Sequence, residues 1–379
     1  MAKNPVVEKP PLDPWRIVVQ HNDFLLPSLL HMLRTGGKVN VSPLYQRRLR
    51  WNQVKKSRLI ESFLLNIPVP PVFLDETQYA TYEVMDGQQR ISTIREFFNN
   101  QLALKGLHLR PDLNSKRFSD LSKETLARIE RRSLSAIVLL TESSQSEAES
   151  FLLRQAVFER LNTGGLQLNA QEIRNCLHAS PFNDLLHELA GNQLFTQVWE
   201  IPPHEVGPEV PITGPLAKNN RFLEMQDNEL VLRFFAYRDS VHIKSSPKST
   251  LDECMSRYRN ASSKEIAELK CLFLDALQLS YDVYGKHTFR LPPKKGRAVG
   301  TLSSPLYDAV MVAMSRFRSN ADEVRQRAAT VAEETASALS DRESEFYALV
   351  VGRPNTKQAT KDRANAMTFV IQGAISTST

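Results

Sequence analysis

The sequence predicts an α+β protein, with a mixed α/β N-terminal domain followed by a mainly α-helical C-terminal domain. Up to about residue 142, short β-prone segments alternate with segments of helical spacing, whereas from Ser146 onward helical spacing continues almost throughout. The charge changes at the same point: residues 1–142 hold 21 basic and 14 acidic side chains, and residues 143–379 hold 27 and 28. The N-terminal part therefore carries the positive charge, and we expect polyanions such as nucleotide phosphates or nucleic acid to approach it.

The composition of the 379 residues excludes several classes of protein. A hydrophobic content of 41% is enough for two or three ordinary domains and excludes a disordered chain. The three cysteines form no CxxC pair, so we expect reduced thiols rather than a disulfide framework or a zinc knuckle. No run approaches the roughly 18 apolar residues of a spanning helix, and no secretion signal is visible, which predicts a cytoplasmic protein without a membrane partner.

The first elements follow a Pro-rich leader over residues 1–17. Residues 18–36 have helical spacing and stop at a glycine pair, which is typical of a helix C-terminus. We expect a short strand at 38–41, followed by a helix over 52–66 that is ended by the prolines after Ile67.

Further strands and one more helix complete the predicted α/β domain, which we place at residues 18–142. The last strand is apolar almost throughout, which suits burial on both faces of a sheet. The strands are expected at 72–74, 81–85, 101–107 and 134–140, and the helix at 87–99.

Helical spacing marks most of the remaining chain. A segment rich in proline and glycine at 201–220 is the best internal loop or hinge, because it cannot sustain a regular element. The helices are expected at 147–161, 169–178, 220–238, 263–284, 304–318, 321–338 and 357–374.

The most informative segment, Asp86-Gly87-Gln88-Gln89-Arg90, lies between a predicted strand and a predicted helix. Gly87 allows a close backbone turn, and the free N–H groups of the first helical turn suit an anion. Arg90 would hold phosphate with its fork of donors, and Asp86 would hold magnesium or orient a water. Gln88 or Gln89 would position that water or read a base edge. The plainer alternative is that Asp86 only caps the helix and that the glutamines are solvated.

A basic segment comes before and within the helix predicted at 52–66. Six basic residues and no acidic one lie between Val41 and Ile60, beside the aromatic residues Tyr45 and Trp51. This composition is typical of a surface that neutralises phosphates and stacks a base, but an ordinary solvated helix face explains it as well. The candidates are Gln46, Arg47, Arg48, Arg50, Lys55, Lys56 and Arg58.

A third candidate segment, residues 158–166, follows a predicted helix. Asn162 and the glycine pair after it form a natural helix C-terminus, yet they also allow close backbone approach to a ligand. Glu159 and Arg160 fit a structural ion pair and equally fit a position facing a nucleotide. The residues alone leave both alternatives open.

Absent motifs narrow the chemistry further. The sequence contains neither GxxxxGK[ST] nor GxGxxG, which excludes a P-loop and a dinucleotide fingerprint. The eight histidines show no HExxH or HxH spacing and no His-Asn-His array, so a built-in metal nuclease is not expected.

Four ordered blocks resemble the GmrSD-type N-terminal domain family. The resemblance covers about residues 20–240, so we expect residues 143–240 to complete the core of that domain and 241–379 to form a separate helical domain. The blocks are LYQRRLRW at 44–51, IPVPPVFL at 67–74, YEVMDGQQRISTI at 82–94 and FERLNTGGLQLNAQEIR at 158–174.

The resemblance implies a ParB/sulfiredoxin-like fold that binds a nucleoside triphosphate in a basic pocket. Members of the family recur in bacterial anti-phage restriction systems, where this domain binds and hydrolyses a nucleotide and governs a nuclease. Many relatives continue into a His-Asn-His endonuclease domain, which residues 240–379 here do not resemble. Cleavage would then fall to a partner chain or not occur.

Carried over onto this sequence, the resemblance assigns roles to the three segments. The turn at 86–90 becomes the phosphate and hydrolysis motif with Mg²⁺ on Asp86, and Gln46 and Arg47 become the opposing wall of the pocket. Glu159, Arg160 and Asn162 would approach the nucleotide, and nucleic acid would meet Arg48, Arg50, Lys55, Lys56 and Arg58.

Three functions are compatible with these residues. The first is an Mg²⁺-dependent nucleoside triphosphatase that acts as a sensor or regulator in a bacterial defence system and works with DNA. The second is a DNA-binding module without turnover, and the third is a non-enzymatic partner of a separate nuclease or toxin. The base of the nucleotide, the partner and any homo-oligomer are not fixed by the sequence.

Overall fold

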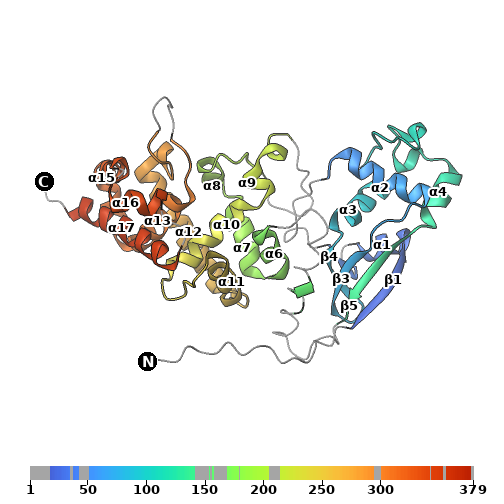
Figure 1. Cartoon of the computed structure of the whole chain (residues 1–379), viewed down its shortest axis with the longest axis horizontal. Coiled ribbons are helices and arrows are strands. Elements are labelled where there is room, and N and C mark those ends of the chain that lie inside the picture. Colours follow the sequence, from blue (N-terminus) through green and yellow to red (C-terminus); the bar gives the residue numbers. More distant parts are fainter. Residues whose placement is uncertain are drawn as a thin grey trace. The chain divides into compact units, whose positions relative to one another are not determined.

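The computed structural model describes residues 18–34, 37–41, 51–140, 153, 156–157, 169–178, 180–204, 214–293, 300–341, 343–352 and 356–376. The chain divides into two compact units. We call them the α/β unit, whose described residues lie between 18 and 157, and the helical unit, which is described from residue 169 onward. The molecule is thus mixed α+β, as the sequence predicts (Figure 1).

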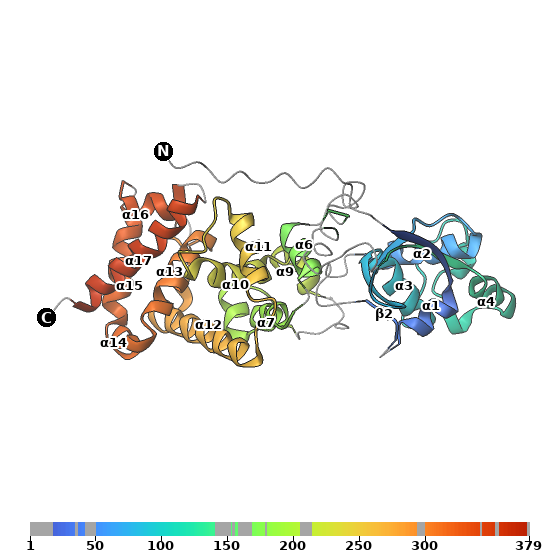
Figure 2. The same ribbon diagram turned by 90° about the horizontal axis from the view of Figure 1, so that it is seen from below.

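A five-stranded mixed sheet forms the centre of the α/β unit. The neighbouring pairs β3–β5 and β2–β4 are parallel, whereas β1–β5 and β3–β4 are antiparallel. Figure 2 shows β1 at an edge of this sheet, with α2 and α3 beside the sheet. The strands, in their order across the sheet, are β1 Val19–Leu25, β5 Ser133–Leu139, β3 Val72–Gln78, β4 Thr81–Asp86 and β2 Val39–Asn40.

The helix predicted over residues 18–36 is wrong in its first half. Val19–Leu25 is strand β1, and helix α1 occupies only Leu26–Met32. The strand pairs with β5 along its whole length, from Val19 opposite Leu139 to Leu25 opposite Ser133. This pairing provides hydrogen-bond partners for the backbone of residues 19–25. The side-chain pattern of these residues fits either a strand or a helix. Pro27 lies in the first turn of α1, where its missing N–H is no loss.

The strand predicted over residues 101–107 is also wrong. Its alternating Leu102 and Leu104 are buried as one face of a strand would be, and Leu107 is buried as well, but the segment joins no sheet. Helix α2, Gln53–Leu65, hydrogen-bonds this segment through its side chains instead. One side-chain donor and one side-chain acceptor of α2, together with the backbone of Ser115 and Lys116, therefore take the place of a neighbouring strand.

The remaining helices of the α/β unit are α3, Gln88–Phe98, and α4, Lys123–Glu130. Helix α2 starts at the Asn52 cap, whose side chain accepts from the Lys55 N–H, and ends at Asn66 in the left-handed conformation. The core between these helices and the sheet is aliphatic and aromatic, and fully buried at Ile60, Ile91, Ile94, Phe97 and Val138.

The helical unit is helical where the sequence predicts helices from residue 169 onward, with the long helix α12 at the expected Ser263–Tyr284. The helix predicted over 220–238 is interrupted at Met225, whose φ is 53°, and the one predicted over 321–338 is interrupted at Arg327. The helix predicted over 147–161 lies largely outside the described residues. The helices of this unit are α6 Ala170–Leu177, α7 Pro181–Ala190, α8 Gln193–Val198, α9 Asn220–Leu223, α10 Gln226–Arg238, α11 Pro247–Arg257, α12, α13 Ser304–Arg316, α14 Ala321–Gln326, α15 Ala328–Ser340, α16 Glu345–Tyr347 and α17 Lys357–Ser376.

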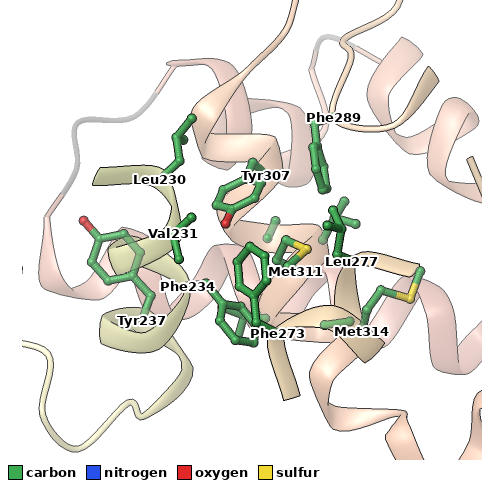
Figure 3. Close-up of a cluster of buried hydrophobic side chains, with 14 of the residues drawn as sticks. Leu230, Val231, Phe234, Tyr237, Phe273, Leu277, Phe289, Tyr307, Met311 and Met314 are labelled. Atoms are coloured by element: carbon green, nitrogen blue, oxygen red, sulfur yellow. The ribbon is translucent and has the colours of Figure 1, made fainter. Parts of the chain in front are cut away.

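Aromatic side chains fill the centre of the helical unit (Figure 3). Phe273 of α12 lies 5.3 Å from Phe234 of α10 between ring centroids, and Tyr307 of α13 lies 4.8 Å from Phe289. Such edge-on contacts stabilise the packing of α10, α12 and α13 beyond the burial of apolar area.

Ion pairs also lie inside this unit. The guanidinium of Arg233 on α10 makes two hydrogen bonds to the Asp308 carboxylate on α13, and the Arg363 guanidinium on α17 lies 3.5 Å from the same carboxylate. All three side chains are buried. Two buried cations thus share one buried anion, and Arg233 also lies 3.8 Å from the Glu229 carboxylate.

None of the described helices is long and apolar enough to cross a membrane.

Candidate functional site

A sharp turn joins the end of β4 to the start of α3 in the α/β unit. Asp86 is the last residue of β4, and Gly87 follows it with a φ of 99°. A Cβ at Gly87 would lie 2.3 Å from Cγ1 of Val72 on the neighbouring strand β3. Both the positive φ and the close packing require glycine here. The turn predicted from the sequence is therefore present, and its tightness depends on a strand that lies earlier in the chain.

The side chains on either side of Gly87 form an ion pair. The Nη2 atom of Arg90 lies 2.9 Å from Oδ2 of Asp86 and donates a second, longer hydrogen bond of 3.3 Å to the Pro71 carbonyl. The Arg90 side chain is 15% exposed, whereas that of Asp86 is 57% exposed. The guanidinium is thus held against the turn from two sides, while the carboxylate remains open to solvent.

The N-cap position of α3 belongs to Gly87, and no described side chain caps this helix. The plainer alternative, in which Asp86 only caps α3, is therefore wrong. The positive end of the α3 dipole and the Arg90 guanidinium both lie beside the exposed carboxylate of Asp86. This arrangement suits an anion, or a metal ion that is bound to an anion such as phosphate.

The two glutamines of the turn are placed differently. Gln89 accepts a hydrogen bond through Oε1 from the Trp51 N–H at 3.2 Å, whereas the Gln88 side chain is buried. The Nε2 atom of Gln89 and the Nε atom of Arg90 are buried, and no described residue accepts from either of them. Two adjacent donors without acceptors favour a ligand that supplies acceptor oxygens, since leaving each unsatisfied costs about 1–3 kcal/mol.

The basic segment of the sequence contacts this turn through Trp51, and strand β2 lies just before the segment. Strand β2 runs parallel to β4, with Asn40 opposite Glu83, so both strands end at the same edge of the sheet. Trp51, at the other end, donates its N–H to Gln89. The predicted site residues Gln46, Arg47, Arg48 and Arg50 lie between these ends, outside the described residues.

The structure separates the three basic residues predicted on α2. The Lys56 ammonium lies 2.6 Å from Oε2 of Glu96 on α3 and is largely buried. Lys55 and Arg58 are exposed, and the Lys55 ammonium lies over the Trp51 ring, 5.0 Å from its centroid. Lys56 therefore joins α2 to α3, while its two neighbours face solvent.

The third predicted segment, with Glu159, Arg160 and Asn162, lies outside the described residues. Helix α6 follows it and belongs to the helical unit. Asn169 and Glu172 cap this helix reciprocally, and Arg174 on it lies 2.7 Å from Asp252 on α11 and 3.6 Å from Glu229 on α10. The end of the block at 158–174 is thus fixed by helices that follow it in sequence.

Sequence reasoning missed several groups that position the turn. These groups are the Pro71 carbonyl, the Trp51 N–H and the side chain of Val72 under Gly87. Two of them are backbone groups, whose hydrogen bonds cannot be inferred from the residue type. The IPVPP run was the available signal, since it fixes the start of β3 beside the turn.

Among the described residues, no group of three or more His, Cys, Asp and Glu side chains is arranged to hold a metal ion. Mg²⁺ commonly takes only one or two carboxylates from a protein and completes its shell with phosphates and water. The exposed carboxylate of Asp86 fits that role. Asp86 is the one protein ligand for Mg²⁺ that is predicted from the sequence.

Comparison with known proteins gives one match. Residues 28–179 match the family model described as GmrSD restriction endonuclease, N-terminal domain. The matched range includes β2 to β5, the turn at Asp86–Arg90 and helix α6. No curated protein and no solved structure matches the chain.

Proposed function

We propose, from the premise that residues 28–179 are a GmrSD-type N-terminal domain, that this chain is a nucleotide-dependent component of a restriction-type defence system. The turn at Asp86–Arg90 binds the phosphates of a nucleoside triphosphate with Mg²⁺ and hydrolyses it. The observation that carries the proposal is the pair of buried donors without described acceptors, Gln89 Nε2 and Arg90 Nε, at one end of a helix.

The donors of the turn support phosphate over other ligands. Gln89 and Arg90 offer only N–H groups to an approaching ligand, because the Gln89 carbonyl oxygen already accepts from Trp51. Phosphate oxygens accept hydrogen bonds and carry the negative charge that the guanidinium and the helix dipole favour. A ligand that replaces Asp86 as the partner of Nη2 would free the carboxylate for a metal ion or a water.

Hydrolysis would use the Asp86 carboxylate. Mg²⁺, when bound, neutralises charge on the transferred phosphate, and the exposed Asp86 carboxylate would hold it from the end of β4. Arg90 would stabilise the charge that develops on the phosphate oxygens in the transition state. Gln89 would orient the attacking water through Nε2, because its Oε1 already accepts a hydrogen bond from the Trp51 N–H.

The remaining predicted residues extend this proposal. Gln46 and Arg47 would form the opposing wall of a ParB/sulfiredoxin-like pocket, and Glu159, Arg160 and Asn162 would approach the nucleotide from the block at 158–174. Cleavage of nucleic acid would fall to a separate nuclease or effector chain, because these 379 residues contain no His-Asn-His array. The nucleotide state would then regulate that partner in the cytoplasm.

Phosphate release by the purified chain with Mg²⁺ tests the proposal, with each of the four ribonucleoside triphosphates in turn. Asp86→Asn should lower turnover at least about 100-fold, because the charge that holds the metal is lost. Asp112→Asn is the matched control. The Asp112 side chain is 56% exposed and pairs with an arginine, Arg110, as Asp86 does with Arg90. It lies in a separate segment of the chain, away from the turn in sequence. Equal turnover in wild type and Asp86→Asn would refute the catalytic role of the turn.

Nucleotide affinity provides the second readout. Arg90→Gln should weaken binding of a fluorescent nucleotide, since it removes a charge-assisted donor. Binding that survives while turnover is absent in the wild type would favour a module that binds nucleotide without hydrolysis. No binding of any nucleotide would reject the site altogether.

A further inference from the structure

We propose that two copies of this chain pair through the free edge of strand β1, so that their two sheets join into one. The paired strands run antiparallel, and a two-fold axis passes beside Asn22. Strands β5 and β3 separate β1 from β4, at whose end the nucleotide turn lies. The pairing therefore uses a part of the α/β unit that the proposed function leaves unassigned, and it does not depend on that function.

The two edges of the sheet differ in length. Strand β2 has two residues, whereas β1 has seven and pairs with β5 along its whole length (Figure 1). In the described part of the chain, β5 is the only strand that pairs with β1. Long edges are usually protected by a lysine, a proline or a bulge, because their unpaired backbone groups can bind another strand. Residues 19–25 contain none of these, so the strand itself offers no protection against pairing.

The hydrogen bonds to β5 fix which backbone groups of β1 point to the free edge. Leu140 donates its N–H to the Val18 carbonyl at 3.0 Å. At the other end of the strand, Leu26 donates its N–H to the Arg132 carbonyl at 2.8 Å. Backbone bonding in an antiparallel pair alternates from one residue to the next, so the even-numbered residues between these ends bond β5. The N–H and C=O groups of residues 19, 21 and 23 therefore point outward.

A second copy can meet these outward groups in one register that covers the whole strand. Odd-numbered residues of one copy must face odd-numbered residues of the other, since these residues turn their backbone groups outward. Full overlap of residues 19–25 then places Asn22 opposite Asn22 of the second copy. His21 lies opposite Asp23, and Val19 lies opposite Leu25, on both sides of the axis.

The polar side chains that meet in this register are complementary. His21 and Asp23 are exposed and point to the same face of the sheet, as alternate residues of a strand do. The imidazole of each copy therefore lies beside the carboxylate of the other, where it forms an opposite-charge pair when protonated and donates a hydrogen bond when neutral. Asp23 accepts from the Ser135 hydroxyl through Oδ1, which leaves Oδ2 for this contact.

Apolar contacts flank the two polar pairs. Val19 is 47% exposed and Leu25 is 50% exposed, and both lie on the face that carries His21 and Asp23. Each Val19 packs against Leu25 of the other copy, which removes apolar surface from water. A parallel pair would instead bring Asp23 next to Asp23, so the charges favour the antiparallel dimer. Such a contact uses the same strand of both copies and closes at two.

Sedimentation equilibrium of the full chain, between about 1 and 100 µM, tests the pairing, because a single edge strand gives a small interface. The wild type should show a monomer–dimer equilibrium. His21→Asp places like charges across the axis twice and should raise the dissociation constant of the dimer at least about 10-fold. The double variant His21→Asp, Asp23→His restores opposite charges and should return that constant to within about 3-fold of the wild type. His108→Asp, at an exposed loop position of the same unit, is the matched control and should leave it unchanged.

A cysteine at the axis tests the register. The two Asn22 residues exchange no backbone bonds across the new edge, so their Cα atoms lie about 4.5 Å apart, within the range that a disulfide spans. Asn22→Cys should therefore link two copies on mild oxidation. Gln20→Cys should not, because the two residues at position 20 are about 13 Å apart along the strands. Both are made in a chain with Cys271→Ser, because Cys271 is exposed, and that chain is the background control.

Each measurement has a result that overturns the proposal. A wild type that stays monomeric over the whole range does so, and so does a dimer that His21→Asp leaves at wild-type affinity. Linkage through Gln20→Cys without linkage through Asn22→Cys would rule out this register. Thermal melting followed by circular dichroism checks that the variants fold, since His21 and Asp23 are exposed. Asp86→Asn should dimerise like the wild type, which keeps a failure of the nucleotide site apart from a failure of the pairing.

Discussion

The carboxylate of Asp86 accepts a hydrogen bond from the guanidinium of Arg90 at 2.9 Å, across a glycine in the left-handed conformation. The same Nη2 atom also reaches the Pro71 carbonyl, so the pair is attached to the start of β3. An arginine held in this way keeps its charge at the turn whether or not a ligand is present, which is the preorganisation that phosphate binding needs.

The fork of donors on Arg90 is expected to matter more than its charge. Arg90→Lys keeps the positive charge but removes the buried Nε donor, which no described residue engages, so nucleotide affinity should fall about 10-fold. Arg110→Lys alters a similar exposed pair with Asp112 and should leave nucleotide affinity unchanged. Titration with a fluorescent nucleotide distinguishes the two variants, and equal affinity in Arg90→Lys and wild type would show that charge alone suffices.

Gly87→Ala should destabilise the α/β unit by about 2–4 kcal/mol, the sum of a positive φ and an overpacked contact with Val72. Gly214 supplies the control, because it also has a positive φ, of 59°, but a Cβ there meets nothing within 4 Å. Gly214→Ala should therefore cost only about 1–2 kcal/mol. The free energies of unfolding of both variants in urea check this. Equal losses of stability would mean that the Val72 side chain moves away from the added methyl group.

Asp308→Asn should destabilise the helical unit by about 3–5 kcal/mol, because it leaves the buried guanidinium groups of Arg233 and Arg363 without their anion. Asp275→Asn breaks the exposed pair with Arg318 and should change stability by less than about 1 kcal/mol. The midpoints of urea unfolding measure both. A small loss in Asp308→Asn would mean that Glu229 compensates for the missing charge.

The helical unit should lose stability in alkali. Burial raises the pKa of the Cys254 thiol from 9.0 to about 12 and that of the Tyr284 hydroxyl from 10.0 to about 12. The unfolded chain gives up these protons first as the pH rises, so the stability they contribute is complete below about pH 9 and declines towards pH 12. Urea midpoints between pH 8 and 11 should fall, and less steeply in Tyr284→Phe. Constant midpoints over that range would contradict the prediction.

The sequence predicted those elements whose signals are local. Helix α12 begins at a reciprocal cap between Ser262 and Glu265 and ends at Gly285, and its bounds were predicted to the residue. The turn after β4 was equally visible, because Gly87 and the change of period at Asp86 stand next to each other in sequence. Caps and turns depend on a few neighbouring residues, which a sequence displays directly.

The elements that were missed depend on distant partners. Strand β1 is a strand because β5 pairs with it, although β5 follows more than 100 residues later. The segment at 101–107 has the apolar spacing of a strand in its first half, but its partners are side chains of α2 and the backbone of Ser115 and Lys116. In the candidate site, the hydrogen bond between Trp51 and Gln89 joins residues 38 apart and orients the glutamine amide. Contacts of this kind leave no local pattern.

Helix α6 has a consequence for how this domain can be recombined with other proteins. It lies inside the residues that match the GmrSD model, yet the acids that neutralise its buried Arg174 come from α10 and α11, beyond residue 179. A gene fusion that breaks the chain after residue 179 would leave the buried Arg174 guanidinium without these acids. The free energy of unfolding would then fall by about 3–5 kcal/mol. A break after α11 would in turn separate Arg233 on α10 from Asp308 on α13, so the whole helical unit has to be exchanged together with the matched residues.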